Sequence, residues 1–180
     1  MTVETADIAR RRFWNPSRKL LYRGLLAGIV LFGGYDGLAG WRDRHAFMIN
    51  ISPSLPNWAF LVTTGVAPRR GEYVFFNPPR TPLVINHFGV NPQPFGKIVY
   101  GVGGDVVTRD GPVFSVNGRV VATAKPLTKR GEPLVLGPTG TIPGGCYYVG
   151  SPHRDGFDSR YAAIGWICNK SVVGTGAPVL

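Results

Sequence analysis

From residue 45 onward the apolar side chains come in short runs, which Pro, Gly and Asn separate. Runs of about four to eight residues have the length of β-strands, whereas a helical pattern needs about ten or more. The 25 glycines and 16 prolines supply turns and interrupt helices. The sequence therefore predicts a mainly β domain over residues 45–180, with a tight hairpin turn at the Asn-Gly pair of Val116–Arg119. The runs are AFMINIS, AFLVTTGV, EYVFFN, PLVINHFGV, KIVYGV, DVVTRD, PVFSVNG, RVVATA, PLVLG and CYYVG.

A second feature is one long apolar segment near the N-terminus, Leu20–Trp41. Its apolar centre is shorter than the roughly 20 residues of a membrane-spanning helix, so the flanking residues must contribute. Arg23 lies near one end, where its guanidinium can reach the membrane interface. Asp36 requires the outer interface or a partner. We predict a signal-anchor helix over residues 20–41, after a polar, basic tail over residues 1–19 and before the domain at 45–180.

Two other interpretations of this segment stay open. A cleavable signal peptide is disfavoured because no clear small-x-small cleavage site follows the apolar centre. A buried or amphipathic helix of a soluble protein would have the same composition. If the segment spans a membrane, the basic residues before it keep the tail in the cytoplasm, and residues after about 42 lie outside.

The net charge of +10 does not by itself indicate a nucleic-acid-binding protein. The first 44 residues hold eight Lys/Arg and four Asp/Glu, and the remaining basic excess is scattered over the rest of the chain. Nucleic-acid-binding surfaces usually concentrate basic residues in a stripe. Only Lys125, Lys129 and Arg130 cluster, which favours a solvated basic surface and leaves anionic lipid or an acidic substrate as alternatives.

Ser54 lies in a proline-rich segment, Ser52–Pro56. Pro53 and Pro56 restrict the backbone and would hold a serine hydroxyl in one orientation. A nucleophilic serine also needs a base within hydrogen-bond reach. None of the three histidines follows a nucleophile-elbow pattern such as GxSxG, so no histidine is singled out as that base.

Lys97 stands inside an apolar, strand-like run, Phe95–Tyr100. Lysine is rarely fully buried without a reason. Its stem can pack while its amine reaches solvent, which is the structural interpretation. The functional interpretation is a base kept neutral by burial, because the ordinary lysine pKa of about 10.4 leaves the amine protonated at neutral pH.

Four motifs in order resemble the type I signal peptidase family and, within it, the conjugative-transfer (TraF-type) peptidases. They are Ser54-Leu55-Pro56, the strand Gly71–Phe75, the strand and turn Lys97–Asp105, and Asp158-Ser159-Arg160. The resemblance runs from about Asn50 to Leu180. It implies a signal-peptidase-like β-rich catalytic domain, without the large extra β-domain of some bacterial housekeeping enzymes.

The resemblance also implies the roles of individual residues. Ser54 would be the nucleophile and Lys97 the general base, with Ser52 as a side-chain donor to the oxyanion. Asp158, Ser159 and Arg160 would support the lysine, although an ordinary structural salt bridge explains Asp158 and Arg160 equally well. Many family members carry a lysine-orienting serine two residues before this Asp, but here that position is Gly156. Ser159 or a water molecule would have to substitute.

On this resemblance we expect a serine endopeptidase, without cofactor or metal, that cleaves exported precursors such as a pilin precursor and in some relatives cyclises the product. The expected location is the bacterial inner membrane, with a single span, lipid contact through the N-terminal helix, and the catalytic domain on the periplasmic side. No nucleic-acid partner is expected. The alternative is a catalytically inactive, membrane-tethered β-module that binds a secretion or pilus component, and Gly156 keeps it open.

The two cysteines, Cys146 and Cys168, lie in apolar runs on either side of the segment that holds Asp158 and Arg160. No CxxC or Cys/His spacing indicates a metal site. If the two runs pair as antiparallel strands, the cysteines come close, and an oxidising compartment would permit a disulfide. Two buried free thiols are the equal alternative.

Overall fold

The computed structural model describes residues 16–52 and 54–179, with side chains from Lys19 onward. The chain divides into two units between Asp43 and Arg44, and each is described by itself. The first unit contains helix α2, Pro16–Arg44. This helix extends beyond both ends of the predicted segment 20–41, because the polar flanks continue the helical hydrogen bonding.

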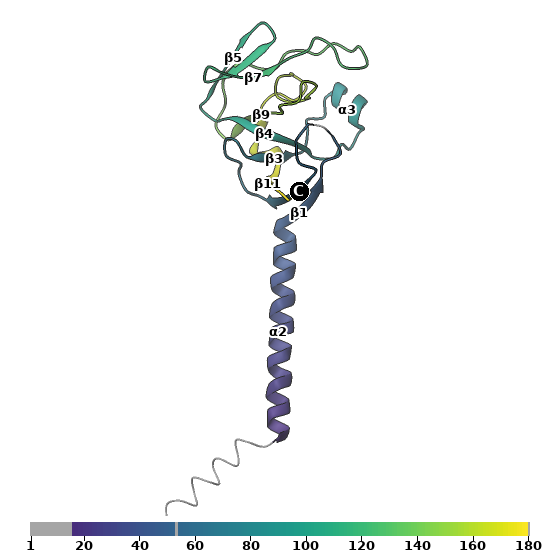
Figure 1. Cartoon of the computed structure of the whole chain (residues 1–180), viewed down its shortest axis with the longest axis vertical. Helices are drawn as coiled ribbons and strands as arrows, with labels where there is room; N and C mark the ends of the chain where they lie inside the picture. Colours follow the sequence, from purple (N-terminus) through teal and green to yellow (C-terminus); the bar gives the residue numbers. More distant parts are fainter. Residues whose placement is uncertain (1–15, 53, 180) are drawn as a thin grey trace, which may run out of the picture. The chain divides into compact units, whose positions relative to one another are not determined.

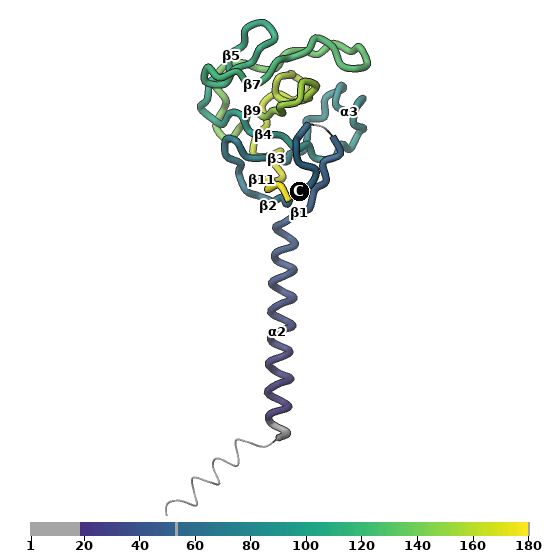
Figure 2. The backbone as a smooth tube through the Cα atoms, viewed as in Figure 1, coloured from purple at the N-terminus to yellow at the C-terminus, as the bar shows by residue number. Residues whose placement is uncertain are grey.

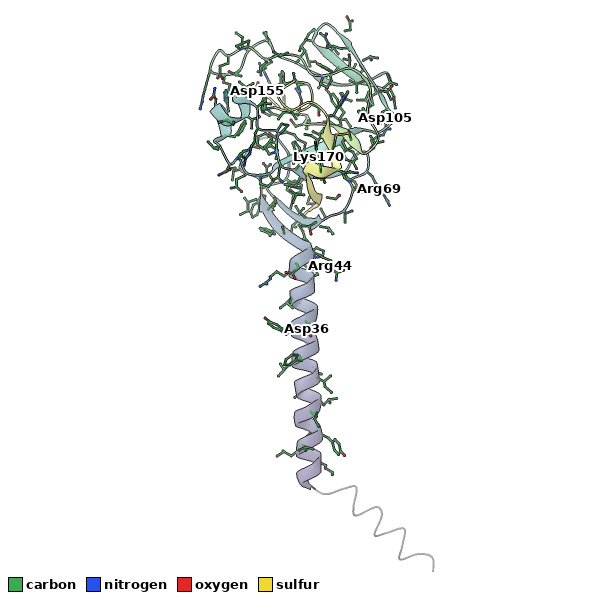
Figure 3. All side chains as sticks on the ribbon, turned by 180° about the vertical axis from the view of Figure 1, so that it is seen from behind. Asp36, Arg44, Arg69, Asp105, Asp155 and Lys170 are labelled. Atoms are coloured by element: carbon green, nitrogen blue, oxygen red, sulfur yellow. A yellow bond between two sulfur atoms is a disulfide. The ribbon has the colours of Figure 1, made fainter. Side chains whose placement is uncertain are left out.

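Helix α2 is the one helix in the described part of the chain that is long and apolar enough to cross a membrane. The qualifying stretch is Lys19–Arg44, with a mean hydropathy of 1.2 and no residue buried within the structure. Figure 3 shows the side chains of Asp36 and Arg44 on this helix, so the apolar stretch carries an acidic residue as the sequence indicated.

The second unit is mainly β, which confirms the predicted fold class (Figure 1). A seven-stranded sheet has the order β1-β2-β11-β3-β4-β9-β10, and a four-stranded sheet has the order β7-β6-β5-β8. All strand pairs are antiparallel. The strands are β1 His45–Ile49, β2 Ala59–Thr64, β3 Tyr73–Phe76, β4 Phe95–Val102, β5 Val106–Asp110, β6 Val113–Val116, β7 Arg119–Thr123, β8 Gly140–Thr141, β9 Cys146–Gly150, β10 Ile167–Cys168 and β11 Val172–Pro178.

The last strand, β11, was not among the predicted runs, yet it lies between β2 and β3 in the larger sheet. Figure 2 shows this yellow C-terminal segment beside strands from the first half of the chain. Glycines make that position possible. A Cβ on Gly174 would lie 2.1 Å from the carbonyl oxygen of Thr63, and one on Gly176 would lie 2.5 Å from the ring of Phe75.

Residues 82–88 are the main correction to the predicted elements. The run PLVINHFGV reads as a strand, but Pro82–Phe88 is a short helix, α3. Thr81 caps it by accepting a hydrogen bond from the Val84 N–H, and Pro82 stands at its start, where a missing N–H costs nothing. The run PLVLG likewise forms only isolated bridges, such as Leu136 with Tyr161, and not a strand. A 3-10 turn, η1 Asn169–Ser171, precedes β11.

The predicted hairpin at Asn117-Gly118 is present between β6 and β7, with positive φ angles of 48° and 79° at the two turn residues. A second turn follows β4, at Gly103–Asp105. The Asp105 carboxylate accepts hydrogen bonds from Val102 N–H (2.8 Å), Asn117 (2.9 Å) and Arg70 (2.6 Å). Burial alone would raise the pKa of Asp105, but these donors hold it below its usual value. The end of β4 is therefore anchored.

Three apolar clusters fill the domain. The first packs the smaller sheet against β9 around Phe114 and Tyr148, and the second surrounds Phe76 and Val99. The third consists of Leu55, Phe60, Val62 and Phe75. Leu55 is 5% exposed and follows Ser54 directly, so its burial fixes the loop that carries Ser54 to the sheet. Burying a side chain of this kind stabilises the fold by about 1.5–3 kcal/mol.

Candidate active site

A cavity of about 1040 Å³ opens within the β domain. Most of its walls come from four parts of the chain: the segment from β1 to Leu55, helix α3, residues 93–97 at the start of β4, and loops within residues 125–161. Ser52, Ser54 and Lys97 all line it, so the predicted nucleophile, oxyanion donor and base face one space. Its volume is that of an ordinary ligand site.

Lys97 lies on β4, opposite Val74 of β3, and its side chain is 5% exposed. Burial lowers the pKa of its amine, which the Asp158 carboxylate opposes and the Arg160 guanidinium reinforces. The structure therefore matches the functional interpretation of a desolvated lysine better than that of an amine reaching solvent. The neutral form of a lysine amine can accept a proton, as a general base must.

Ser54 lies in a turn at the cavity wall and is half-buried. Its neighbour Pro53, part of the predicted proline restraint, lies outside the described residues. The loop is held by Asn50, whose side-chain amide donates to the carbonyl oxygens of Leu55 (3.1 Å) and Asn57 (3.0 Å). The sequence analysis did not single out this residue, although asparagine side chains often bind the backbone two residues further on, as Asn50 Oδ1 does with the Ser52 N–H.

Ser52 is exposed and lines the same cavity. Its backbone N–H and its hydroxyl both donate to Asn50 Oδ1, at 3.1 and 3.0 Å. The hydroxyl therefore has an acceptor within the loop in the free protein. To serve an oxyanion it would have to turn from Asn50 toward the cavity.

Asp158, Ser159 and Arg160 are all buried, with exposed fractions of 0%, 0% and 2%. Asp158 binds Arg160 through Nε at 2.8 Å and Nη2 at 2.9 Å. Burial raises the pKa of the Asp158 carboxyl, and the Arg160 guanidinium opposes that rise. Arg160 also donates to the carbonyl oxygens of Thr123 (3.2 Å) and Ser151 (2.9 Å), so the pair ties the end of β7 to the loop after β9.

The Ser159 hydroxyl is already engaged, because its oxygen accepts a hydrogen bond from the Val149 N–H at 3.0 Å. It is therefore bound to β9 in this structure. Gly156 lines the cavity and lies close to the buried pair. A Cβ at Gly156 would lie 2.2 Å from Ser151 Oγ and 2.8 Å from Asp158 Oδ2, so a side chain at this position would require both oxygens to move.

The rim of the cavity carries charged residues that the sequence did not connect with the site. Lys125 forms an ion pair with Asp155, and Lys129 approaches the same carboxylate at 3.6 Å. The predicted basic cluster is therefore part of the cavity rim, and an acidic residue offsets some of its charge. Figure 3 shows Asp155 and Asp105 on opposite sides of the domain. Asp155 therefore pairs with lysines at the cavity, whereas Asp105 holds the turn after β4.

Two histidines also line the cavity, but each has a partner. His87 pairs with Glu132, and His153 Nδ1 accepts a hydrogen bond from the Asp155 N–H at 3.1 Å. The His87 hydrogen bond lowers the pKa of Glu132. Among the described residues, no group of three or more His, Cys, Asp or Glu side chains is placed to hold a metal ion.

Cys146 and Cys168 form a disulfide and lie opposite each other on the antiparallel strands β9 and β10. The prediction that paired strands bring the two cysteines together is thus confirmed, and the free-thiol alternative does not hold. The disulfide closes the base of the loop that contains Asp158 and Arg160.

Comparisons with known proteins identify the family of the chain. The family model described as signal peptidase, peptidase S26, matches residues 39–180. Among solved structures, the chain is similar to a signal peptidase I from Enterococcus faecalis V583, with 26% sequence identity and a TM-score of 0.38. That match covers 60% of this chain and 95% of the other. No curated protein matches the chain.

Proposed function

The chain belongs to the peptidase S26 family of signal peptidases, which are serine hydrolases that act on precursor proteins, and we propose that Ser54 is its nucleophile and Lys97 its general base. The observation that carries this proposal is Lys97 itself, a buried lysine that shares a cavity with Ser54. Burial keeps the pKa of Lys97 below its usual value, which favours the neutral amine that the chemistry needs.

In this proposal the precursor enters the cavity in extended form, because protease substrates commonly add a strand to a sheet edge. The Ser54 hydroxyl attacks the carbonyl carbon of the scissile bond, and Lys97 takes its proton. The tetrahedral intermediate collapses to an acyl-enzyme, while Lys97 returns the proton to the leaving amine. Lys97 then deprotonates a water molecule, which attacks the acyl carbonyl carbon; the ester bond to Ser54 breaks, and Lys97 returns the proton to Ser54 Oγ as the product acid leaves.

The oxyanion of the intermediate is held by the Ser54 backbone N–H and by the Ser52 hydroxyl, which leaves Asn50 for this purpose. Such donors act where charge develops in the transition state. Asp158 and Arg160 hold the loop behind Lys97 in place. No cofactor takes part.

The finer substrate assignment is a pilin-like exported precursor of a conjugation system, with cleavage on the periplasmic side of a bacterial inner membrane. It rests on the resemblance of the four ordered motifs to TraF-type peptidases. Helix α2 would hold the domain at the membrane, since its length and composition suit a span. If an amine of the same substrate attacks the acyl-enzyme in place of water, the product is a cyclic pilin.

A second candidate function is a catalytically inactive, membrane-tethered module that binds a secretion or pilus component. Gly156 favours it, because the resemblance leads one to expect a lysine-orienting hydroxyl there. Reaction of Ser54 with a serine-directed acylating probe separates the two functions. An inactive module leaves Ser54 unlabelled in the folded protein, whereas a working dyad labels it and Lys97→Ala abolishes the labelling.

The test of the proposed function is cleavage of candidate pilin precursors, followed by intact-mass measurement. We expect Ser54→Ala and Lys97→Ala each to abolish processing, and the double variant to be no worse, because the two residues act as a unit. A cyclised product is lighter by one water than the linear one, so the same spectrum separates the two endings. Full processing by either single variant contradicts the assignment.

A further inference from the structure

Ser151, the first residue after β9, is a buried serine with an unused hydroxyl. It is 1% exposed, and in the described part of the chain its Oγ has no hydrogen-bond partner. Its backbone is fully engaged: the N–H donates to Asp158 Oδ2 at 3.1 Å, and the carbonyl accepts from Arg160 Nη2 at 2.9 Å. A buried hydroxyl without a partner is costly, so a serine held here calls for a ligand or a neighbouring group.

The register of the sheet identifies that neighbour. Ile98 of β4 pairs with Gly150 of β9. Extending this antiparallel register by one residue brings Lys97 opposite Ser151. Directly opposed residues project from the same face of a sheet, with Cβ atoms about 4.5–5.5 Å apart. Lys97 and Ser151 are both buried, so the two polar side chains share one enclosed region.

The surroundings of Gly156 give independent evidence that the Ser151 hydroxyl lies near the cavity. A Cβ at that position would lie 2.2 Å from Ser151 Oγ, so the Ser151 hydroxyl occupies the space that a side chain at position 156 would enter. Gly156 itself lines the cavity that Lys97 lines. The hydroxyl therefore stands immediately behind the cavity wall, on the side of the buried pair Asp158–Arg160.

We propose that Ser151 is the positioning residue for Lys97: its hydroxyl, which is unbonded among the described residues, turns to accept a hydrogen bond from the amine and directs the lone pair of the amine toward Ser54. The inference rests on the proposed function. A neutral amine on a flexible four-carbon stem has several orientations, of which few serve proton transfer from Ser54. Asp158 and Arg160 bind the Ser151 backbone, so the position from which its hydroxyl projects toward the lysine is held in place.

Two comparisons test the role of the Ser151 hydroxyl: Ser151→Ala against a control serine, and Ser151→Thr against Ser151→Val. Ser151→Ala removes the hydroxyl, and we expect kcat to fall by about 10- to 100-fold with KM unchanged, because misplacement by about 1 Å has an effect of that size. Ser151→Thr and Ser151→Val have the same shape, but only threonine keeps a hydroxyl. Threonine should therefore retain at least about ten times more activity than valine. Ser115→Ala, on β6 in the smaller sheet, is the control and should behave as wild type.

Moving the serine hydroxyl from position 151 to position 156 gives a second test. Gly156→Ser should disturb the site in the wild-type chain, where Ser151 occupies the space. In the Ser151→Ala background the shortest contact is gone and the Asp158 carboxylate, 2.8 Å from a Cβ at this position, has to shift only slightly, so the same change should recover part of kcat. A double variant that keeps the wild-type melting temperature and shows no recovery counts against the proposal. If that variant does not fold, the comparison of threonine with valine decides.

The outcomes separate this inference from the proposed function. If the wild-type protein and Ser54→Ala both fail to cleave any precursor, the proposed function fails. If wild type cleaves and needs Ser54 and Lys97, while Ser151→Ala keeps wild-type kcat or threonine and valine lose activity equally, the Ser151 inference alone is overturned.

Discussion

Single residues carry the chemistry of this domain because burial changes what they can do. Lys97 is the clearest case. Its amine lies inside a β-domain beside an Asp–Arg pair that is itself fully hydrogen-bonded. The charges of Asp158 and Arg160 act on the pKa of Lys97 in opposite directions, so the pair does not cancel the lowering of that pKa by burial. A buried base beside a neutralised pair is an arrangement that a surface lysine cannot provide.

The first prediction concerns Lys97 and pH. Because burial lowers its pKa below the 10.5 of the unfolded chain, the folded protein binds fewer protons than the unfolded chain between the two pKa values. Stability therefore rises with pH through that window. Lys97→Met removes the cost of burying the amine, so it should melt at a higher temperature than wild type at neutral pH, and the difference should shrink toward about pH 10.

Thermal melts at several pH values measure this, with Lys170→Met at an exposed lysine as the control. The same protonation should make kcat/KM of the wild-type protein fall on the acid side, since only the neutral amine acts as a base. A constant difference in melting temperature across the pH range would mean that Lys97 is not desolvated.

The second prediction concerns Ser52. If its hydroxyl leaves Asn50 and donates to the oxyanion, Ser52→Ala should lower kcat by about 100- to 1000-fold with little change in KM. Ser52→Thr keeps a hydroxyl and should retain much more activity. Steady-state cleavage of a precursor peptide measures both variants. An unchanged kcat for Ser52→Ala would leave the backbone N–H of Ser54 as the remaining oxyanion donor.

At the scale of elements, three connections hold the catalytic segments together. Asn50 braces the Ser54 loop, the Asp105 turn anchors the end of β4, and the disulfide between β9 and β10 closes the loop that carries Asp158. Each one holds an element that carries part of the site, so a change in one of them should affect the site through geometry and not through the chemistry itself.

The third prediction concerns the disulfide. Its two cysteines are separated by 22 residues in sequence, and a closed loop of that size stabilises the fold by about 3 kcal/mol in the chain-entropy model. The double variant Cys146→Ala/Cys168→Ala should therefore melt about 10 °C lower than wild type. Reductant should bring wild type to the same value and leave the double variant unchanged. Equal alkylation of wild type with and without reductant would show that the thiols are free.

At the scale of the whole molecule, the chain combines an apolar helix with a β-domain whose cavity is assembled from distant segments. The C-terminal strand β11 lies between β2 and β3, so the sheet is completed only when the last residues of the chain are in place. Since β2 follows the Ser54 loop and β3 pairs with β4, this placement of β11 joins the wall holding Ser54 and the wall holding Lys97 in one sheet.

The fourth prediction is topological. The basic residues crowd before the apolar helix, so residues 1–19 should be cytoplasmic and the β-domain should lie outside. A phosphatase reporter that is active only outside the cytoplasm, fused after Leu180, measures this. It should be active on the full chain, and replacing Arg10, Arg11, Arg12, Arg18 and Lys19 by neutral residues should make the orientation mixed. Cytoplasmic activity of a complementary reporter on the full chain would contradict the prediction.

The sequence by itself determined the fold class, the apolar helix, the Asn117-Gly118 hairpin and the family, because strand length, turn chemistry and ordered motifs are local properties. It misread Pro82–Phe88 because a seven-residue helix is too short to show a helical period, and only the Thr81 cap and Pro82 marked it. The tertiary structure decided the rest: the Cys146–Cys168 disulfide, the desolvation of Lys97, the Asn50 brace and the unused hydroxyl of Ser151. Burial, register and unsatisfied polar atoms depend on which distant strands become neighbours, and no local pattern contains that information.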